Sequence, residues 1–224
     1  MILGCVTIGQ APRVDVVPDI EPLLPGIAVI ERGALDDLDA DGIAALAPEP
    51  GRAALVSRLR DGGSAVLDEE RMLPLVQRAV DAAVADGAEA VLVLCTGHLP
   101  SLRASVPVYT AERLARGAAA TLVGDDRLGV LAPTPRQVGD IATRWRNDLG
   151  RDVIVVAVDP YTADDDAFAD AGRTLGEAGC DWIFMDCIGY SERMADIVHG
   201  AAGARALTAR GLAARMAAAA VATA

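Results

Sequence analysis

The sequence predicts an α/β protein built as two related α/β/α lobes with parallel sheets. Apolar strands alternate with helical segments along the chain, as in proteins assembled from βαβ units. The segment GAEAVLVLCTGH at 87–98 returns as GCDWIFMDCIGY at 179–190, so that Cys95 matches Cys187. A weaker similarity aligns GCV…APR at 4–13 with GVL…TPR at 129–136. We therefore expect two lobes related by a pseudo-twofold axis, residues 1–110 with 204–224 and residues 111–203, and an active cleft between them.

The first lobe begins with an apolar strand at Ile2–Ile8, followed by a helix over Val14–Leu24 that Pro18 and Pro22 interrupt. A second strand is expected at Ala28–Ile30. Residues 33–52 are acidic and rich in Gly and Pro, which indicates a loop with one helical turn. Two short strands, Ala54–Leu59 and Ala65–Leu67, meet at the turn Asp61-Gly62-Gly63. Apolar residues at helical spacing then predict a helix that ends near Gly87, before a buried strand at Ala90–Cys95 and a short one at Val106–Tyr109.

The second lobe repeats this alternation. A helix over 111–122 precedes a strand at Leu128–Leu131, which ends in Pro133-Thr134-Pro135. A helix over 135–148 and a strand at Val153–Val158 follow. Asp164–Glu177 has helical spacing and an acidic first turn, which suits the positive end of the helix dipole. The remaining elements are a strand at Trp182–Cys187, a helix over 191–199 and an Ala-rich helix over 208–222.

Composition limits the possible functions. The formal net charge of −12 disfavours nucleic-acid backbones and anionic membranes as partners. All 20 basic residues are arginine, which excludes a lysine Schiff base and hence pyridoxal phosphate chemistry, and also excludes a P-loop lysine. Four cysteines without a Cys-x-x-Cys pair, and two histidines, disfavour zinc. We expect no cofactor and no metal.

The sequence shows neither a signal peptide nor a membrane-spanning apolar run. The opening MILGCVTIG is short and is followed at once by polar residues, and the Ala-rich end contains Arg210 and Arg215. We therefore expect a cytoplasmic protein whose thiols are reduced.

Cys95 and Cys187 are the candidate catalytic residues. Each ends an expected strand and precedes a glycine turn, where ligands bind in open α/β sheets. Backbone N–H groups in such turns bind anions and favour the thiolate. If the lobes face each other, a small carboxylic acid would lie between two thiols. One thiolate would remove the proton next to the carboxylate, and the other thiol would protonate the opposite face without a cofactor.

Several neighbours are candidates for substrate binding, and their roles stay open at this point. His98 either contacts the substrate, orients Cys95 or is a surface histidine, and Asp186 either raises the basicity of Cys187 or is a polar strand end. Arg13 and Arg136 either neutralise an acid or are solvated loop charges. The residues expected to bind substrate are Thr7, Gln10, Thr96, Gly97, His98, Thr134, Ile188, Gly189 and Tyr190, with Tyr161 as a further loop candidate.

Other chemically active residues have simpler interpretations. Cys5 lies inside the first strand, and Cys180 precedes its strand without a partner at position 88, so both are interpreted as core residues. His199 is expected at a helix end. The run Asp164-Asp165-Asp166 is interpreted as a helix cap rather than a metal site.

Four segments, TIGQAPR, LVSRL, LCTGH and MDCIGY, resemble the AroM family over essentially the full length. That family is similar to the aspartate/glutamate racemase superfamily, which includes amino-acid and hydantoin racemases, maleate isomerases and arylmalonate decarboxylases. The resemblance implies two α/β lobes, each with a cysteine beside the substrate, here Cys95 and Cys187, and it implies a dimer. The superfamily commonly has Asn-Thr after its first cysteine and Gly-Cys-Thr around its second. This chain has Thr96-Gly97 and Asp186-Cys187-Ile188 there.

These observations lead to three functional hypotheses. The first is a cofactor-independent racemase or isomerase of a small carboxylate-containing molecule, using both thiols for proton transfer. The second is an enzyme that uses one cysteine, a decarboxylase or a cis–trans isomerase. The third is a non-catalytic metabolite-binding or regulatory protein linked to aromatic amino-acid metabolism, which is the association behind the family's name.

Overall fold

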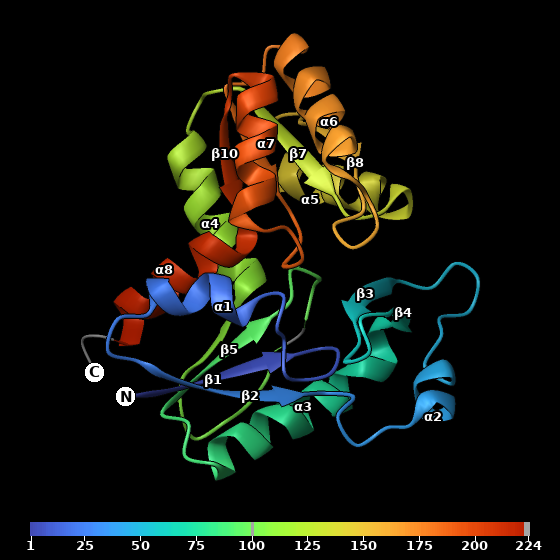
Figure 1. Ribbon diagram of the computed structural model, residues 1–224, viewed down its shortest axis with the longest axis vertical. Coiled ribbons are helices and arrows are strands. Elements are labelled where there is room, and N and C mark those ends of the chain that lie inside the picture. The colour runs from blue at the N-terminus through green and yellow to red at the C-terminus, as the bar shows by residue number, and fades with distance from the viewer. Residues whose placement is uncertain (100, 222–224) are drawn as a thin grey trace. The chain divides into compact units, whose positions relative to one another are not determined.

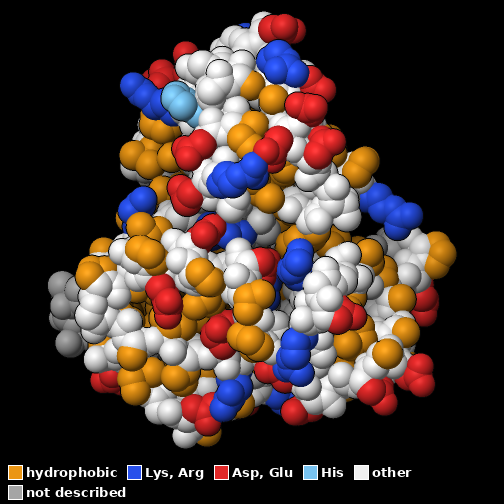
Figure 2. Space-filling view, in the orientation of Figure 1, with side chains coloured by type: hydrophobic (Ala, Val, Ile, Leu, Met, Phe, Trp, Pro, Cys, Tyr) orange, Lys and Arg blue, Asp and Glu red, His pale blue; other side chains and the backbone are white. Residues whose placement is uncertain are grey.

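A computed structural model describes residues 1–99 and 101–221. The chain divides into two compact units, residues 1–112 with 217–224 and residues 113–216. Residues 204–216, expected in the first lobe, therefore group with the second, because a strand in this segment joins the second sheet. No helix within the described ranges is long and apolar enough to cross a membrane. Acidic and arginine side chains are interspersed over the face shown in Figure 2.

The first unit contains a four-stranded parallel sheet with the order β2-β1-β5-β6. Its strands are β1 (Ile2–Thr7), β2 (Ala28–Gly33), β5 (Ala90–Leu94) and β6 (Val108–Thr110), and its helices are α1 (Val17–Ile20), α2 (Ala40–Ala44) and α3 (Glu69–Ala85). Figure 1 shows α1 and α3 on opposite sides of this sheet. Every residue of β5 is buried, as expected for the centre of a parallel sheet. The Asp61-Gly62-Gly63 turn joins an antiparallel hairpin of β3 (Ala54–Arg58) and β4 (Ser64–Asp68), as the sequence predicted.

The second unit contains a parallel sheet with the equivalent order, β8-β7-β9-β10. Its strands are β7 (Leu128–Ala132), β8 (Ile154–Ala157), β9 (Trp182–Met185) and β10 (Arg205–Thr208). The helices between them are α5 (Val138–Leu149), α6 (Asp165–Glu177) and α7 (Glu192–Ala202), of which α6 and α7 lie side by side (Figure 1). Helices α4 (Ala111–Val123) and α8 (Ala209–Val221) each cross the boundary between the units. The last residue of the expected helix 208–222 lies outside the described residues.

The repeated sequence has the same structural role in both units. Gly87 and Gly179 each adopt a positive φ, +98° and +76°, which lets the chain leave a helix and enter β5 or β9. The acid that follows, Glu89 or Asp181, accepts a hydrogen bond from the backbone N–H of Ile2 (2.7 Å) or Arg127 (2.9 Å). The acids thus fix the start of the neighbouring strand, β1 or β7. The glycine and the acid therefore have the same roles in both copies.

Two expectations need correction. Strand β10 was not predicted, because Arg205–Thr208 is a four-residue edge strand with no clear alternation of burial. The strands expected to reach Cys95 and Cys187 end at Leu94 and Met185. The N–H of Cys187 bonds back to the carbonyl of Met185 at 3.0 Å, so the chain has already turned away from β7 at the cysteine.

Candidate functional site

Both cysteines lie at the point in their sheet where ligands usually bind. In each unit the first and third strands of the sheet, β1 with β5 and β7 with β9, are neighbours, and the chain connections leave them in opposite directions. A crevice forms beyond the carboxyl ends of two such strands. Cys95 directly follows β5, and Cys187 follows β9 by two residues. The topology of each unit, taken separately, therefore favours a ligand beside its thiol.

The two thiols accept the same kind of hydrogen bond from the backbone of the turn that follows them. The N–H of Gly97 donates to the Cys95 Sγ at 3.3 Å, and the N–H of Gly189 donates to the Cys187 Sγ at 3.4 Å. An N–H donor stabilises negative charge on sulfur more than it stabilises a neutral thiol. Cys95 and Cys187 are 6% and 7% exposed, so each sulfur is largely shielded from bulk water. Each sulfur therefore has a backbone hydrogen-bond donor in a place with little access for bulk water.

Another segment closely approaches the glycine two residues after each cysteine, so a side chain there would force a neighbour to move. A Cβ on Gly97 would lie 2.2 Å from Cδ2 of Leu55 in β3. A Cβ on Gly189 would lie 2.8 Å from the ring of Tyr161, in the loop after β8. The Cys-x-Gly pattern therefore reflects side chains that pack closely against the turn after each thiol.

A buried acid, Glu112, lies between the backbone of Cys95 and the side chain of His98. The N–H of Glu112, at the start of α4, donates to the Cys95 carbonyl at 3.1 Å. The Glu112 carboxylate is buried, and its Oε1 lies 3.7 Å from the exposed His98 Nδ1. Thr96, between Cys95 and Gly97, is also buried. Glu112 was not among the predicted residues, since nothing in its local sequence links it to the cysteine.

The surroundings of Cys187 contain two buried charged side chains. Asp186 accepts a hydrogen bond from Trp145 Nε1 at 3.1 Å. Arg210, in α8, donates from Nε to the Ile188 carbonyl at 2.9 Å and from Nη2 to the Gly189 carbonyl at 2.7 Å. Arg210 thus holds the turn that positions the Gly189 N–H. Sequence reasoning missed it, because an arginine in an Ala-rich helix gives no signal of this contact.

Tyr190 is part of the core of the second unit. Its hydroxyl donates to the Val158 carbonyl at 2.7 Å, and its ring packs edge-to-face against Phe168. Burial, with smaller effects from Cys187 and Asp186, raises its pKa well above the ordinary tyrosine range. Ile188 is buried as well. The structure therefore gives Tyr190 a packing role as a neutral phenol.

The residues after β1 form a connected polar group. Thr7 Oγ1 accepts a hydrogen bond from the Gly9 N–H at 3.3 Å and another from Arg13 Nη1 at 3.0 Å. Arg13 is buried and forms a two-point ion pair with Asp15. It is therefore not a solvated loop charge. In the equivalent position of the second unit, Arg136 is exposed, and the half-buried Thr134 hydroxyl donates to Gln137 Oε1 at 3.1 Å.

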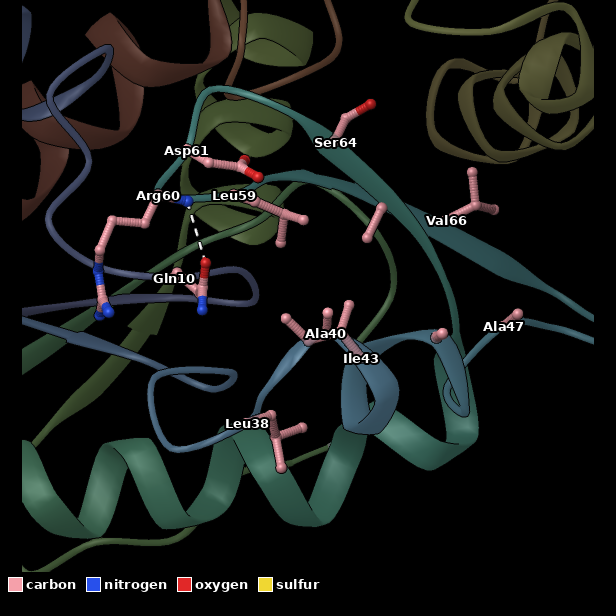
Figure 3. A pocket seen from close by; sticks show the side chains of 12 residues that line it. Gln10, Leu38, Ala40, Ile43, Ala47, Leu59, Arg60, Asp61, Ser64 and Val66 are labelled. Atoms are coloured by element: carbon pink, nitrogen blue, oxygen red, sulfur yellow. Dashed lines mark hydrogen bonds between the residues drawn. The ribbon is translucent and has the colours of Figure 1, made fainter.

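Gln10, in the segment after β1, lines a pocket of about 640 Å³ between α2 and the β3–β4 hairpin (Figure 3). Its Oε1 accepts from the Arg60 N–H at 3.0 Å. Most of the pocket is apolar, with Leu38, Ile43, Leu59 and Val66 in its wall. The Arg60 guanidinium donates to the Ala11 carbonyl and pairs with Asp36. Because Asp36 compensates the charge of Arg60, the pocket suits an apolar group better than an acidic one.

The remaining cysteines, His199 and the acidic run have structural roles. Burial, assisted by Glu31 and Glu21, raises the pKa of Cys5 to about 12, and burial also raises the pKa of Cys180. Asp164 caps α6 by accepting from the Ala167 N–H at 3.0 Å, as predicted. His199 is in the last turn of α7, with Nδ1 2.7 Å from the Ala204 carbonyl. Within residues 1–99 and 101–221, no group of acids, cysteines and histidines is arranged to hold a metal ion.

A protein-family comparison identifies the chain. The family model described as "AroM protein" matches residues 3–221. The chain belongs to the AroM family. No curated protein matches the AroM chain in sequence.

Solved structures share the fold of this AroM protein at low sequence identity. Allantoin racemase from Klebsiella pneumoniae is 16% identical, with a TM-score of 0.65 and coverage of 100% of this chain and 88% of that one. A glutamate racemase isoform from Bacillus anthracis is 14% identical, with a TM-score of 0.65 and coverage of 99% and 82%. A cysteine variant of arylmalonate decarboxylase, in a sulfate-associated form, is 15% identical, with a TM-score of 0.64 and coverage of 100% and 94%. These similarities confirm the predicted racemase-like α/β fold.

Proposed function

We propose that this AroM protein is a cofactor-independent racemase or isomerase that acts on a small carboxylate-containing molecule. The observation that carries the proposal is the pair of matching turns, in which the N–H of Gly97 or Gly189 donates to the sulfur of Cys95 or Cys187. Both turns lie at the carboxyl ends of central parallel strands, where ligands bind. The fold shared with enzymes named as racemases supports the same class of reaction.

In this mechanism the two thiols act on the same carbon. One cysteine, as thiolate, takes the proton from the carbon next to the carboxylate and becomes a thiol. The electron pair of the broken C–H bond moves into the carboxylate group. The other cysteine gives its proton to the opposite face of that carbon and becomes the thiolate. The product has inverted configuration, and reversal of the roles completes the reverse reaction without an oxidant, a metal or a cofactor.

The experiment is a screen of carboxylate metabolites for exchange of the α-proton with deuterated solvent, followed by NMR. Because exchange reports proton removal, the screen needs no knowledge of the product. We expect wild-type protein to exchange at least one acid, and Cys95→Ser and Cys187→Ser each to abolish inversion of it. If both single variants keep wild-type exchange, the two-thiol mechanism is wrong.

A one-thiol enzyme is the second candidate, because the two cysteines have different acidic neighbours. Asp186 is buried next to Cys187, whereas Cys95 is preceded by Leu94. Such an asymmetry suits a reaction in which one cysteine protonates a carbanion left by decarboxylation. That mechanism is supported if one of the two serine variants retains full activity, with carbon dioxide release as the direct readout.

A further inference from the structure

The β3–β4 hairpin covers the carboxyl ends of β1 and β5 in the first unit. A Cβ on Gly9, two residues beyond β1, would lie 2.3 Å from the Arg58 carbonyl oxygen and 2.4 Å from the Ser57 Oγ. Leu55, two residues before Ser57 and on the same buried face of β3, makes the equivalent close approach to Gly97. One face of β3 therefore contacts both the end of β1 and the Cys95 turn.

Ser57 has an unusual hydroxyl. The residue is 2% exposed, and within the described parts of the chain its Oγ makes no hydrogen bond. A buried hydroxyl without a partner costs free energy, whereas alanine would fill the same space without that cost. The hydroxyl at this position is thus suited to a group that comes from outside the chain.

Neighbouring polar groups at the same sheet edge are already engaged. The Thr7 hydroxyl accepts from Gly9 and Arg13, and the Gln10 amide bonds to Arg60 and to the Leu35 carbonyl. The Arg13 charge is compensated by Asp15. Ser57 is therefore a hydrogen-bond donor with unused capacity beside Gly9, on the same face of β3 as Leu55, which contacts the Cys95 turn.

We propose that Ser57 Oγ donates a hydrogen bond to a carboxylate oxygen of a ligand bound at the ends of β1 and β5. The inference rests on the proposed function for the position of the ligand beside Cys95. It assigns Ser57 to binding, since its hydroxyl is not required to give up or accept a proton in the reaction. It also gives a role to the hairpin, because β3 supplies the ligand contact.

The test measures binding of malonate, a small dicarboxylate, by isothermal titration calorimetry, and measures the melting temperature without malonate. We expect Ser57→Ala to melt at the wild-type temperature or above, because an unpaired buried hydroxyl has been removed. We expect its affinity for malonate to fall at least about tenfold, because a hydrogen bond to a charged group has been lost. Ser64→Ala, which changes an exposed serine on the other strand of the hairpin, is the matched control and should bind like wild type.

Three results would overturn the proposal. They are absence of malonate binding by wild type, wild-type affinity in Ser57→Ala, and a clear loss of melting temperature in Ser57→Ala without malonate. The last result would give the hydroxyl a structural role. Cys95→Ser separates this inference from the proposed function, since it should retain malonate binding while losing proton exchange. If no acid exchanges and malonate binding still depends on Ser57, the proposed function fails and this inference stands.

Discussion

Alanine at Gly97 or Gly189 should destabilise the protein by crowding the turns that hold the thiols. Carbon atoms in contact are normally about 3.5–4.0 Å apart. The new Cβ would lie 2.2 Å from Leu55 Cδ2 at Gly97, and 2.8–2.9 Å from Tyr161 and Pro160 at Gly189. Overpacking of this kind lowers the free energy of unfolding by about 1–3 kcal/mol. Gly189→Ala should be near the upper end, because an aromatic ring and a proline adjust less than a leucine side chain.

The assay is thermal unfolding followed by circular dichroism. For a chain of this length 1 kcal/mol corresponds to about 2–4 °C in Tm, so losses of roughly 2–12 °C are expected. Gly117→Ala is the matched control, because Gly117 lies inside α4 with no atom near the position of a Cβ. It should raise the free energy of unfolding by about 0.5–1 kcal/mol.

A double-mutant cycle identifies the cause. In a Leu55→Ala background the crowding partner at Gly97 is gone, so the added cost of Gly97→Ala should fall close to zero. An unchanged cost in that background, or a Gly97→Ala protein as stable as wild type, would refute the reasoning about close packing.

Further predictions concern the buried thiol, the helix cap and Arg210. Because burial raises the pKa of Cys5 from its ordinary value of 9.0 to about 12, the folded state keeps a proton that the unfolded chain loses. Wild type should therefore lose stability relative to Cys5→Ala between pH 9 and 12, by up to about 1.4 kcal/mol per pH unit, in chemical denaturation curves. Asp164→Ala should lower the free energy of unfolding by about 1 kcal/mol, because the α6 cap is lost. Asp166→Ala should change it by a few tenths of a kcal/mol at most. Arg210→Met should lower the free energy of unfolding by about 2–5 kcal/mol and change the alkylation rate of Cys187 but not of Cys95, since two buried carbonyls next to Cys187 lose their donor. Equal changes at both cysteines, measured by mass spectrometry, would argue against a local role for Arg210.

The sequence predicted those helices, strands and caps that have a recognisable residue pattern within a single segment. The repeat placed Cys95 and Cys187 at equivalent strand ends, and the run Asp164-Asp165-Asp166 was interpreted as a helix cap, of which Asp164 is the capping residue. Strand β10 was missed, because four residues at a sheet edge carry little pattern. Contacts between distant segments could not be predicted, since nothing local links Arg210 to Ile188 or Leu55 to Gly97. The pairing of β3 with β4 was predicted from its turn, but its position over Gly9 was not.

The most direct test of the central proposal asks whether Cys95 and Cys187 serve one site. A short bifunctional alkylating reagent such as 1,3-dibromoacetone, applied to the native protein, joins two thiols only when both can reach the same small molecule. We expect peptide mapping by mass spectrometry to find a single reagent linking Cys95 to Cys187 within one chain, with Cys5 and Cys180 unmodified. Separate single-ended adducts on Cys95 and Cys187, with no cross-linked peptide, would contradict the proposal that two thiols act on one carbon.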